Sequence, residues 1–270
     1  MKKSITTITS IIACAVASYA AADCNASTNC SCASKADKQI NTLADEDVCA
    51  NLLERFSASV TVGFESEYVF RAKKYAGASI NPEVDAAYDL GMGFSVYAGV
   101  WGNMPVKSST TNEMDVYTGV TYDIANFTFD LGYIGYLYSD SAERNSHEVK
   151  FALTYDTVDF LGDFNVSPTA AFFYDFITGY YTVEAGASYS APVTKWIADR
   201  DWGKINLAAV YGWTTSSSNG YTYVAVSADA VIAINDYCSV SVGARYAYSH
   251  DTLVDRTDKV WYGTSLTVGF

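Results

Sequence analysis

Apolar and polar residues alternate along most of the chain, from about residue 57 to the last residue. Residues 58–65 read ASVTVGFE, in which each apolar residue is followed by a small or polar one. Successive side chains of a β-strand point to opposite faces, so this period of two predicts strands with one apolar and one polar face. Continued at the same period, this first strand places Tyr68 and Phe70 on its apolar face and Arg71 on its polar face.

The alternation recurs in roughly twelve segments of about 18 residues, which suits membrane strands of about 9–11 residues and their connections. Short turns alternate with long polar loops, which are expected at 72–79, 103–112, 139–146, 214–220 and 249–258. Only Ala191–Lys204 is long on the side of the short turns. Because short turns on one side and long loops on the other are typical of outer-membrane barrels, we predict an all-β fold. The expected architecture is a transmembrane, antiparallel, up-and-down β-barrel of about twelve strands over residues 57–270.

A secreted β-sandwich is the alternative fold, because its strands alternate in the same way. The expected strands are long for a sandwich, and their polar faces offer no second hydrophobic layer. A mean hydropathy of +0.04 fits a soluble protein, but also a barrel whose residues alternate between lipid and water. The 22 Tyr, 13 Phe and 18 Gly against 4 Pro favour strands with aromatic ends. Beyond the start of the chain no segment approaches 18 consecutive apolar residues, which excludes helical membrane spans.

The first 22 residues are predicted to be a signal peptide. Lys2 and Lys3 are followed by an apolar stretch and by Ala20-Ala21-Ala22, which offers a cleavage site. A lipidation site at Cys14 is the alternative. Residues 23–56, with helix-like spacing of their apolar residues, are predicted to form a Cys-containing N-terminal segment in the periplasm.

The chain is acidic, with a net charge of −13 that becomes −15 once the two Lys of the signal are removed. Nucleic acid is therefore not expected as a partner, because phosphate neutralisation needs Lys and Arg. The charge is compatible with a surface protein or with a cation-preferring pore.

The C-terminal strand has a distinctive end: its last residue is aromatic, and apolar residues precede it at every second or fourth position. The residues concerned are Tyr262, Leu266, Val268 and Phe270. Lipid-facing residues alternate in this way in the closing strand of a barrel. The pattern is similar to the terminal signal by which the barrel-assembly machinery recognises outer-membrane barrels. An amphipathic strand that happens to be last is the simpler alternative.

Three motifs occur in the first strands: SEYVFR at 66–71, YAGVWGN at 97–103 and EMDVYTG at 113–119. Over roughly residues 57–122, these motifs resemble the TorF family of porin-like outer-membrane proteins. The family usually has Gly after the Arg, where this chain has Ala72. The resemblance implies a barrel with porin-like activity.

Catalytic activity is not predicted. The chain has two His, His147 and His250, each flanked by Ser and an acid. Neighbouring residues of a strand point to opposite faces, so neither tripeptide is itself a catalytic triad. No metal-ligand cluster, phosphate-binding glycine loop or dinucleotide fingerprint is present in the sequence, so no cofactor is expected.

Five cysteines remain after removal of the signal: Cys24, Cys30, Cys32, Cys49 and Cys238. All five are expected on the periplasmic side, which is oxidising, and they are therefore disulfide candidates. An odd number allows either a disulfide-linked partner in the cell envelope or intrachain disulfides with one spare thiol.

Taken together, these patterns predict a passive outer-membrane channel in contact with lipid, with weak cation selectivity for small hydrophilic solutes or ions. The polar faces carry more acids than bases. The residues predicted to line the pore are Glu65, Glu67, Arg71, Glu83, Asp85, Asp115, Asp130, Glu148, Lys150, Glu184, Asp229 and Arg245. A plugged barrel that serves as a structural or adhesive surface protein is the alternative. Large residues expected inside, such as Tyr97, Trp101 and Phe173, could fill a lumen of this size.

Overall fold

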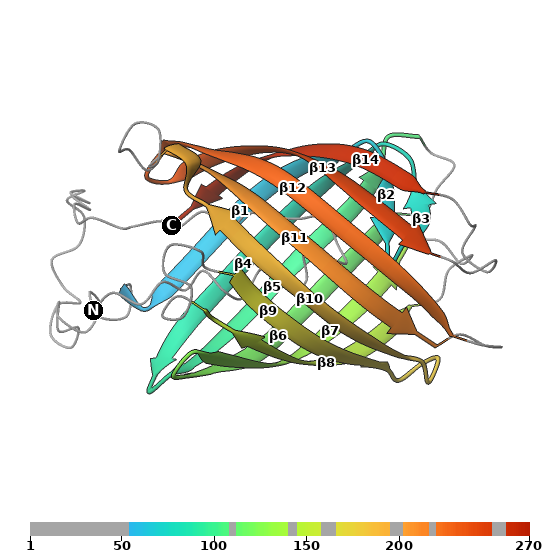
Figure 1. Cartoon of the computed structure of the whole chain (residues 1–270), viewed down its shortest axis with the longest axis horizontal. Helices are drawn as coiled ribbons and strands as arrows, with labels where there is room; N and C mark the ends of the chain where they lie inside the picture. Colours follow the sequence, from blue (N-terminus) through green and yellow to red (C-terminus); the bar gives the residue numbers. More distant parts are fainter. Residues whose placement is uncertain are drawn as a thin grey trace, which may run out of the picture.

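The computed structural model describes residues 54–107, 112–139, 145–157, 166–194, 202–215, 220–249 and 258–270. Twelve antiparallel strands of this part of the chain form a closed barrel (Figure 1). They are β1 (Phe56–Glu65), β4 (Ser79–Gly91), β5 (Phe94–Pro105), β6 (Glu113–Ile124), β7 (Phe127–Tyr138), β8 (Ser146–Tyr155), β9 (Val166–Asp175), β10 (Tyr181–Ala191), β11 (Gly203–Thr214), β12 (Tyr221–Asn235), β13 (Cys238–Ser249) and β14 (Lys259–Gly269). β2 (Tyr68–Phe70) and β3 (Lys73–Ala76) form a separate two-stranded hairpin. No described helix is long and apolar enough to cross a membrane.

The first and last strands close the barrel. β1 pairs with β4 on one side and with β14 on the other, where Val60 lies opposite Val268. The Thr61 and Thr267 hydroxyls, 2.9 Å apart, join the same two strands on the inner face. Every barrel strand therefore has two neighbours, and the sheet has no free edge. The predicted barrel is confirmed and the sandwich is excluded, since the sheet closes on itself.

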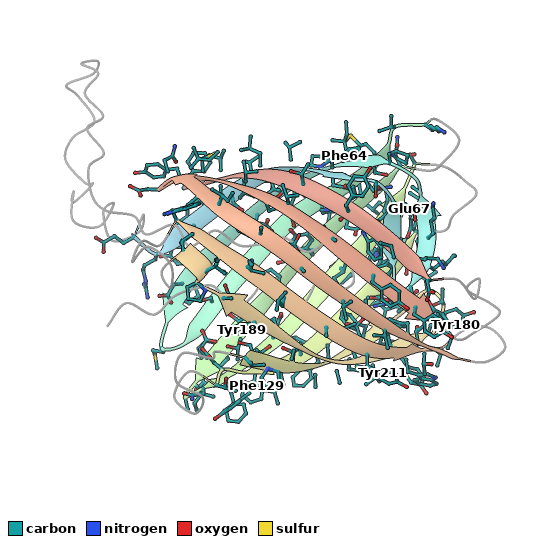
Figure 2. All side chains as sticks on the ribbon, turned by 45° about the horizontal axis from the view of Figure 1, so that its top comes forward. Phe64, Glu67, Phe129, Tyr180, Tyr189 and Tyr211 are labelled. Atoms are coloured by element: carbon teal, nitrogen blue, oxygen red, sulfur yellow. The ribbon has the colours of Figure 1, made fainter. Side chains whose placement is uncertain are left out.

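The outer wall of the barrel is apolar. Its exposed residues include Val62, Val84, Leu131, Leu207 and Leu266, each with two-fifths or more of its surface accessible. Aromatic side chains gather toward both ends of this wall, and Figure 2 labels Phe129 near one end and Tyr211 toward the other. An apolar band between aromatic girdles is the surface that outer-membrane barrels present to lipid. The predicted C-terminal alternation lies on this wall, with Phe270 and Tyr262 both largely exposed.

The two ends of the barrel differ in their connections. The near end is the end where β1 begins and β14 finishes, and the far end is the opposite one (Figure 1). Two-residue turns join β4 to β5, β6 to β7 and β12 to β13 at the near end. Two near-end connections are longer: residues 192–202 join β10 to β11, and residues 156–165 join β8 to β9. The second of these is not predicted by the sequence pattern.

The predicted first strand is too long. The chain leaves the wall after Ser66, whose N–H still donates to Tyr262 O at 2.9 Å. Residues 67–78 turn into the barrel interior and carry β2 and β3, drawn at the far end in Figure 1. We call residues 67–78 the inner hairpin. Tyr68, expected on the lipid-facing side, is instead 1 % exposed and packs against inward-facing residues such as Trp101.

Candidate functional site in the barrel interior

The acidic and basic residues predicted from the polar faces gather inside the barrel. Ten of the twelve lie on the inner face of barrel strands, and nine of these ten are at most 7 % exposed: Glu65, Glu83, Asp115, Asp130, Glu148, Lys150, Glu184, Asp229 and Arg245. Asp85, the tenth, is partly exposed. The other two, Glu67 and Arg71, belong to the inner hairpin and not to the wall. The period of two therefore places the wall residues correctly, whereas the hairpin residues reach the interior by another route.

Glycines on the inner face let large aromatic side chains lie flat against the wall. A Cβ atom added to Gly99 would come within 2.4 Å of the Tyr117 ring, and one added to Gly119 would come equally close to the Tyr97 hydroxyl. The Tyr117 and Tyr97 rings therefore lie directly over Gly99 and Gly119 of the neighbouring strands. Tyr97 and Tyr117 are both 8 % exposed as a result. Trp101 and Phe173, expected inside, are also buried, as is Tyr136.

Two tyrosine hydroxyls of the inner face reach carboxylates two strands away. Tyr117 donates to Glu83 at 3.0 Å and also to Asp85, which joins β6 to β4. Tyr97 donates to Asp130 at 2.9 Å, which joins β5 to β7. Hydrogen bonds to carboxylates in a low-dielectric interior are strong, so these contacts hold the acidic groups against the wall.

Three bases neutralise part of the acidic charge. Lys150 lies 2.6 Å from Asp130 across β7 and β8. Arg245 lies 2.8 Å from Asp229 and 3.4 Å from Glu65. These pairs are nearly inaccessible to solvent, so the loss of one partner would leave a buried charge without compensation.

Arg71 is the third base, and it also forms a buried ion pair. It reaches from the inner hairpin to Glu148 on β8 and donates to both carboxylate oxygens, at 2.7 and 2.9 Å. Burial alone would lower the pKa of the Arg71 guanidinium, but the charge and the hydrogen bonds of Glu148 raise it well above its ordinary value. Arg71 is therefore a permanent cation at this position.

Three other acids on the inner wall form no salt bridge within the described residues. In the described part of the chain, no Lys or Arg forms a salt bridge with Glu83, Asp85 or Asp115. Glu113 is a further inward acid, 6 % exposed, and it accepts a hydrogen bond from Tyr138 at 3.1 Å. It was absent from the predicted pore-lining set although it has the same parity as Asp115, which is the signal that identifies it. The inner wall therefore has an excess of acidic groups.

The inner hairpin contacts opposite sides of the interior. Tyr68 and Ala76 pack with residues of β5 to β9, including Trp101 and Phe173. Val69 and Ala72 pack with residues of β11 to β14, including Trp261. The hairpin therefore bridges the barrel near its far end.

His147 is the candidate catalytic residue that the structure describes. His147 bonds through Nδ1 to the hydroxyl of Tyr133, 2.7 Å away on the outer face, whereas the next residue, Glu148, points inward. The Ser-His-Glu tripeptide is therefore divided between two faces. His250 lies outside the described residues, and these residues contain no cluster of three or more metal-ligating side chains.

The disulfide candidates are only partly covered by the structure. Cys238, at the start of β13, is a free and partly exposed thiol. Cys24, Cys30, Cys32 and Cys49 lie outside the described residues, as does the signal peptide. Disulfide formation therefore stays a prediction.

Comparisons with known structures support the architecture. The COG4313 outer membrane channel from Pseudomonas putida F1 is 7 % identical, with 80 % of this chain and 95 % of that one covered and a TM-score of 0.54. LpxR from Salmonella typhimurium is 10 % identical, with 78 % and 99 % covered and a TM-score of 0.51. At these identities the similarity shows the fold of outer-membrane barrels and no more. A comparison with curated proteins gives no match.

A family assignment comes from the sequence of the first two-thirds of the barrel. Residues 53–209 match the family described as "Bacterial protein of unknown function (Gcw_chp)". The match spans more than half of the chain, from the residues before β1 into β11. It does not carry the TorF name, so that resemblance stays a prediction. The chain belongs to the Gcw_chp family.

Proposed function

We propose that this protein is an outer-membrane channel for small hydrophilic solutes or ions with a weak preference for cations. The observation that carries the proposal is the excess of acids on the inner wall of a closed barrel whose outer wall is apolar. Acidic groups in a narrow passage with low-dielectric walls attract cations and repel anions. The fold similarity to an outer-membrane channel is compatible with this function.

The ion pairs indicate which acids determine selectivity. Glu65, Asp130, Glu148 and Asp229 each have a basic partner, so their charges are largely compensated. Glu83 and Asp85 accept hydrogen bonds from Tyr117, and among the described residues neither they nor Asp115 form a salt bridge. We therefore assign cation preference to these three residues, two of which lie on β4 and one on β6, with β5 between the two strands.

A reversal-potential measurement in a KCl gradient tests this assignment. Purified protein in planar bilayers should prefer K⁺, and the Glu83→Gln, Asp85→Asn, Asp115→Asn variant should lose that preference. Glu67→Gln is the matched control, because Glu67 pairs with Lys74 at the partly exposed base of the inner hairpin. Anion preference of the unaltered protein, or unchanged selectivity in the triple variant, would contradict the proposal.

A plugged barrel is the second candidate, in which the protein serves as a structural or adhesive surface protein. The observation in its favour is that the inner hairpin packs against opposite sides of the interior. Single-channel recording separates the two candidates. Discrete conductance steps at any voltage support the channel, whereas an absence of current in protein that is demonstrably inserted supports the plug.

The proposed location follows from the same barrel. We place the outer wall in the outer membrane, the near end toward the periplasm and the long far-end loops outside the cell. Residues 23–56 would then lie in the periplasm, where an envelope partner could be linked through their cysteines. The C-terminal alternation is proposed as the signal for the barrel-assembly machinery, and no enzymatic activity is proposed.

A further inference from the structure

The Arg71 side chain occupies a site with the features of a binding site for a planar cation. Its guanidinium makes two parallel hydrogen bonds to Glu148 and lies 5.0 Å from the centre of the Phe173 ring. A planar guanidinium can bind a carboxylate through two hydrogen bonds and stack on an aromatic ring at the same time. A compact ammonium cannot make both contacts in this way, so the site favours guanidinium over ammonium. Tyr136 donates to Glu148 at 3.0 Å and thereby fixes the orientation of the carboxylate.

The barrel wall supplies most of this site. Glu148, Phe173 and Tyr136 belong to the wall strands β8, β9 and β7, whose positions are fixed by ladders on both sides. Glu184 on β10 is 2 % exposed and has one carboxylate oxygen without a hydrogen-bond partner among the described residues. Its other oxygen accepts from Tyr223, which packs in the same cluster as Ala72, the residue next to Arg71. The wall would therefore carry at least two buried acids facing an empty space if Arg71 were withdrawn.

The segment that delivers Arg71 is weakly held in comparison. β2 and β3 contain three and four residues, and their pairing is irregular between Tyr68 and Val69. An isolated two-stranded hairpin is at best marginally stable in water. Arg71 and Ala72 at its tip have φ angles of 47° and 59°. This left-handed region is unfavourable for residues other than glycine. The wall site is thus rigid, whereas its occupant is on a short and strained turn.

We propose that the site formed by Glu148, Phe173, Tyr136 and Glu184 binds an organic cation with a guanidinium or amidinium group, and that Arg71 fills it when this ligand is absent. The ligand competes with Arg71, and its binding releases the tip of the inner hairpin from the wall. The expected class of ligand depends only on the geometry of this site. The consequence for transport, a wider passage at the far end, rests on the proposed channel function.

Chemical rescue tests the site without any measurement of current. Arg71→Ala removes the side chain beyond Cβ, and ethylguanidinium has the size and shape of the removed part. Millimolar ethylguanidinium should raise the melting temperature of the detergent-solubilised Arg71→Ala variant, whereas ethylammonium should not. The unaltered protein should show a smaller increase, because the added cation must first displace Arg71.

A second substitution shows whether the effect arises at the predicted carboxylate. In the Arg71→Ala, Glu148→Gln variant, ethylguanidinium should bind about tenfold more weakly or worse, since a charge-assisted bidentate contact is lost. The same measurement is made on Arg71→Gly, because glycine adopts the left-handed backbone of residue 71 without strain. A melting shift in Arg71→Gly but not in Arg71→Ala would indicate that the turn misfolds in the alanine variant. Equal melting shifts in all variants, or no shift in either Arg71 variant, would overturn the proposal.

Bilayer recordings distinguish the failure of the site from the failure of the channel. We expect Arg71→Ala to conduct more than the unaltered protein, and its current to stay raised in ethylguanidinium, because the bound cation does not tether the hairpin to the wall. Rescue of melting temperature in a protein that never conducts would support the site and reject the channel. Conductance without rescue would support the channel and reject the site.

Discussion

β1 and β2 are separated by only Ser66 and Glu67, yet different interactions hold them in place. β1 forms a ladder of backbone hydrogen bonds with a full-length strand on each side. β2 has one short partner, β3, and depends on side-chain packing around Tyr68 and on the Arg71–Glu148 pair. The backbone ladders of the wall therefore do not include the inner hairpin, so under the proposal above the hairpin can move without opening the sheet.

The largest effect is expected from breaking the closing strand of the wall. Replacing Leu266 and Phe270 by Asp puts two charges on the lipid-facing side of β14 next to β1, which should prevent insertion. The measurement is the yield of folded barrel in the membrane fraction, read from the change in gel mobility on boiling. Phe270→Tyr is the control and should insert normally. Normal yield of the double-Asp variant would show that this strand end carries no insertion information.

An intermediate effect is expected from a buried ion pair of the wall. Lys150→Met leaves Asp130 without its cation and should lower the free energy of unfolding by about 3–5 kcal/mol. The partly exposed Lys74–Glu67 pair of the inner hairpin is the matched control, and Lys74→Met should cost about 0–1 kcal/mol. Urea titration in lipid vesicles gives both values. Similar losses of unfolding free energy for the two variants would mean that the buried pair of the wall stabilises the protein no more than the exposed pair of the hairpin.

The added substitution Asp130→Asn sharpens the same experiment. It removes the uncompensated charge, so the Lys150→Met, Asp130→Asn variant should recover a large part of the lost stability. No recovery would show that Lys150 acts through its packing against Tyr97 and not through its charge.

The smallest effect concerns two residues with left-handed backbone. Met92, in the near-end turn between β4 and β5, has φ of 57° and is 94 % exposed, so Met92→Gly should stabilise the barrel by about 1 kcal/mol or less. Ala72, at the tip of the inner hairpin, has a similar φ but a buried methyl group. Ala72→Gly should gain less, because the relaxed backbone is offset by lost packing. The measurement is the free energy of unfolding of each variant. A larger stabilisation by Ala72→Gly than by Met92→Gly would show that the buried methyl group of Ala72 contributes little.

The wall could be predicted from the sequence because a ladder allows only one arrangement of its side chains. Once Val60 and Val62 face outward, Thr61 and Glu65 must face inward, and no distant residue can alter this. The inner position of the ten wall residues follows from that rule, whereas the strand number comes from counting the alternating segments and the barrel from their length and connections. Glu113 obeys it as well.

The inner hairpin could not be predicted in the same way. The sequence SEYVFR continues the period of two, so nothing local shows that the chain leaves the wall after Ser66. Its position depends on Trp101, Glu148 and Tyr221, which lie tens of residues further along the chain and contact Tyr68 or Arg71. Ion pairs such as Lys150–Asp130 also require the strand register, which alternation alone does not provide.

The hydrogen bond between Thr61 and Thr267 joins residues 206 positions apart. Such a contact closes one of the largest loops that the chain can form, and the entropy of loop closure makes it a late event in folding. Until then β1 and β14 are unpaired edges, and the apolar face of each completed hairpin is exposed to water. Folding of this chain is therefore slow by topology, and the half-formed sheet is the species most prone to aggregate.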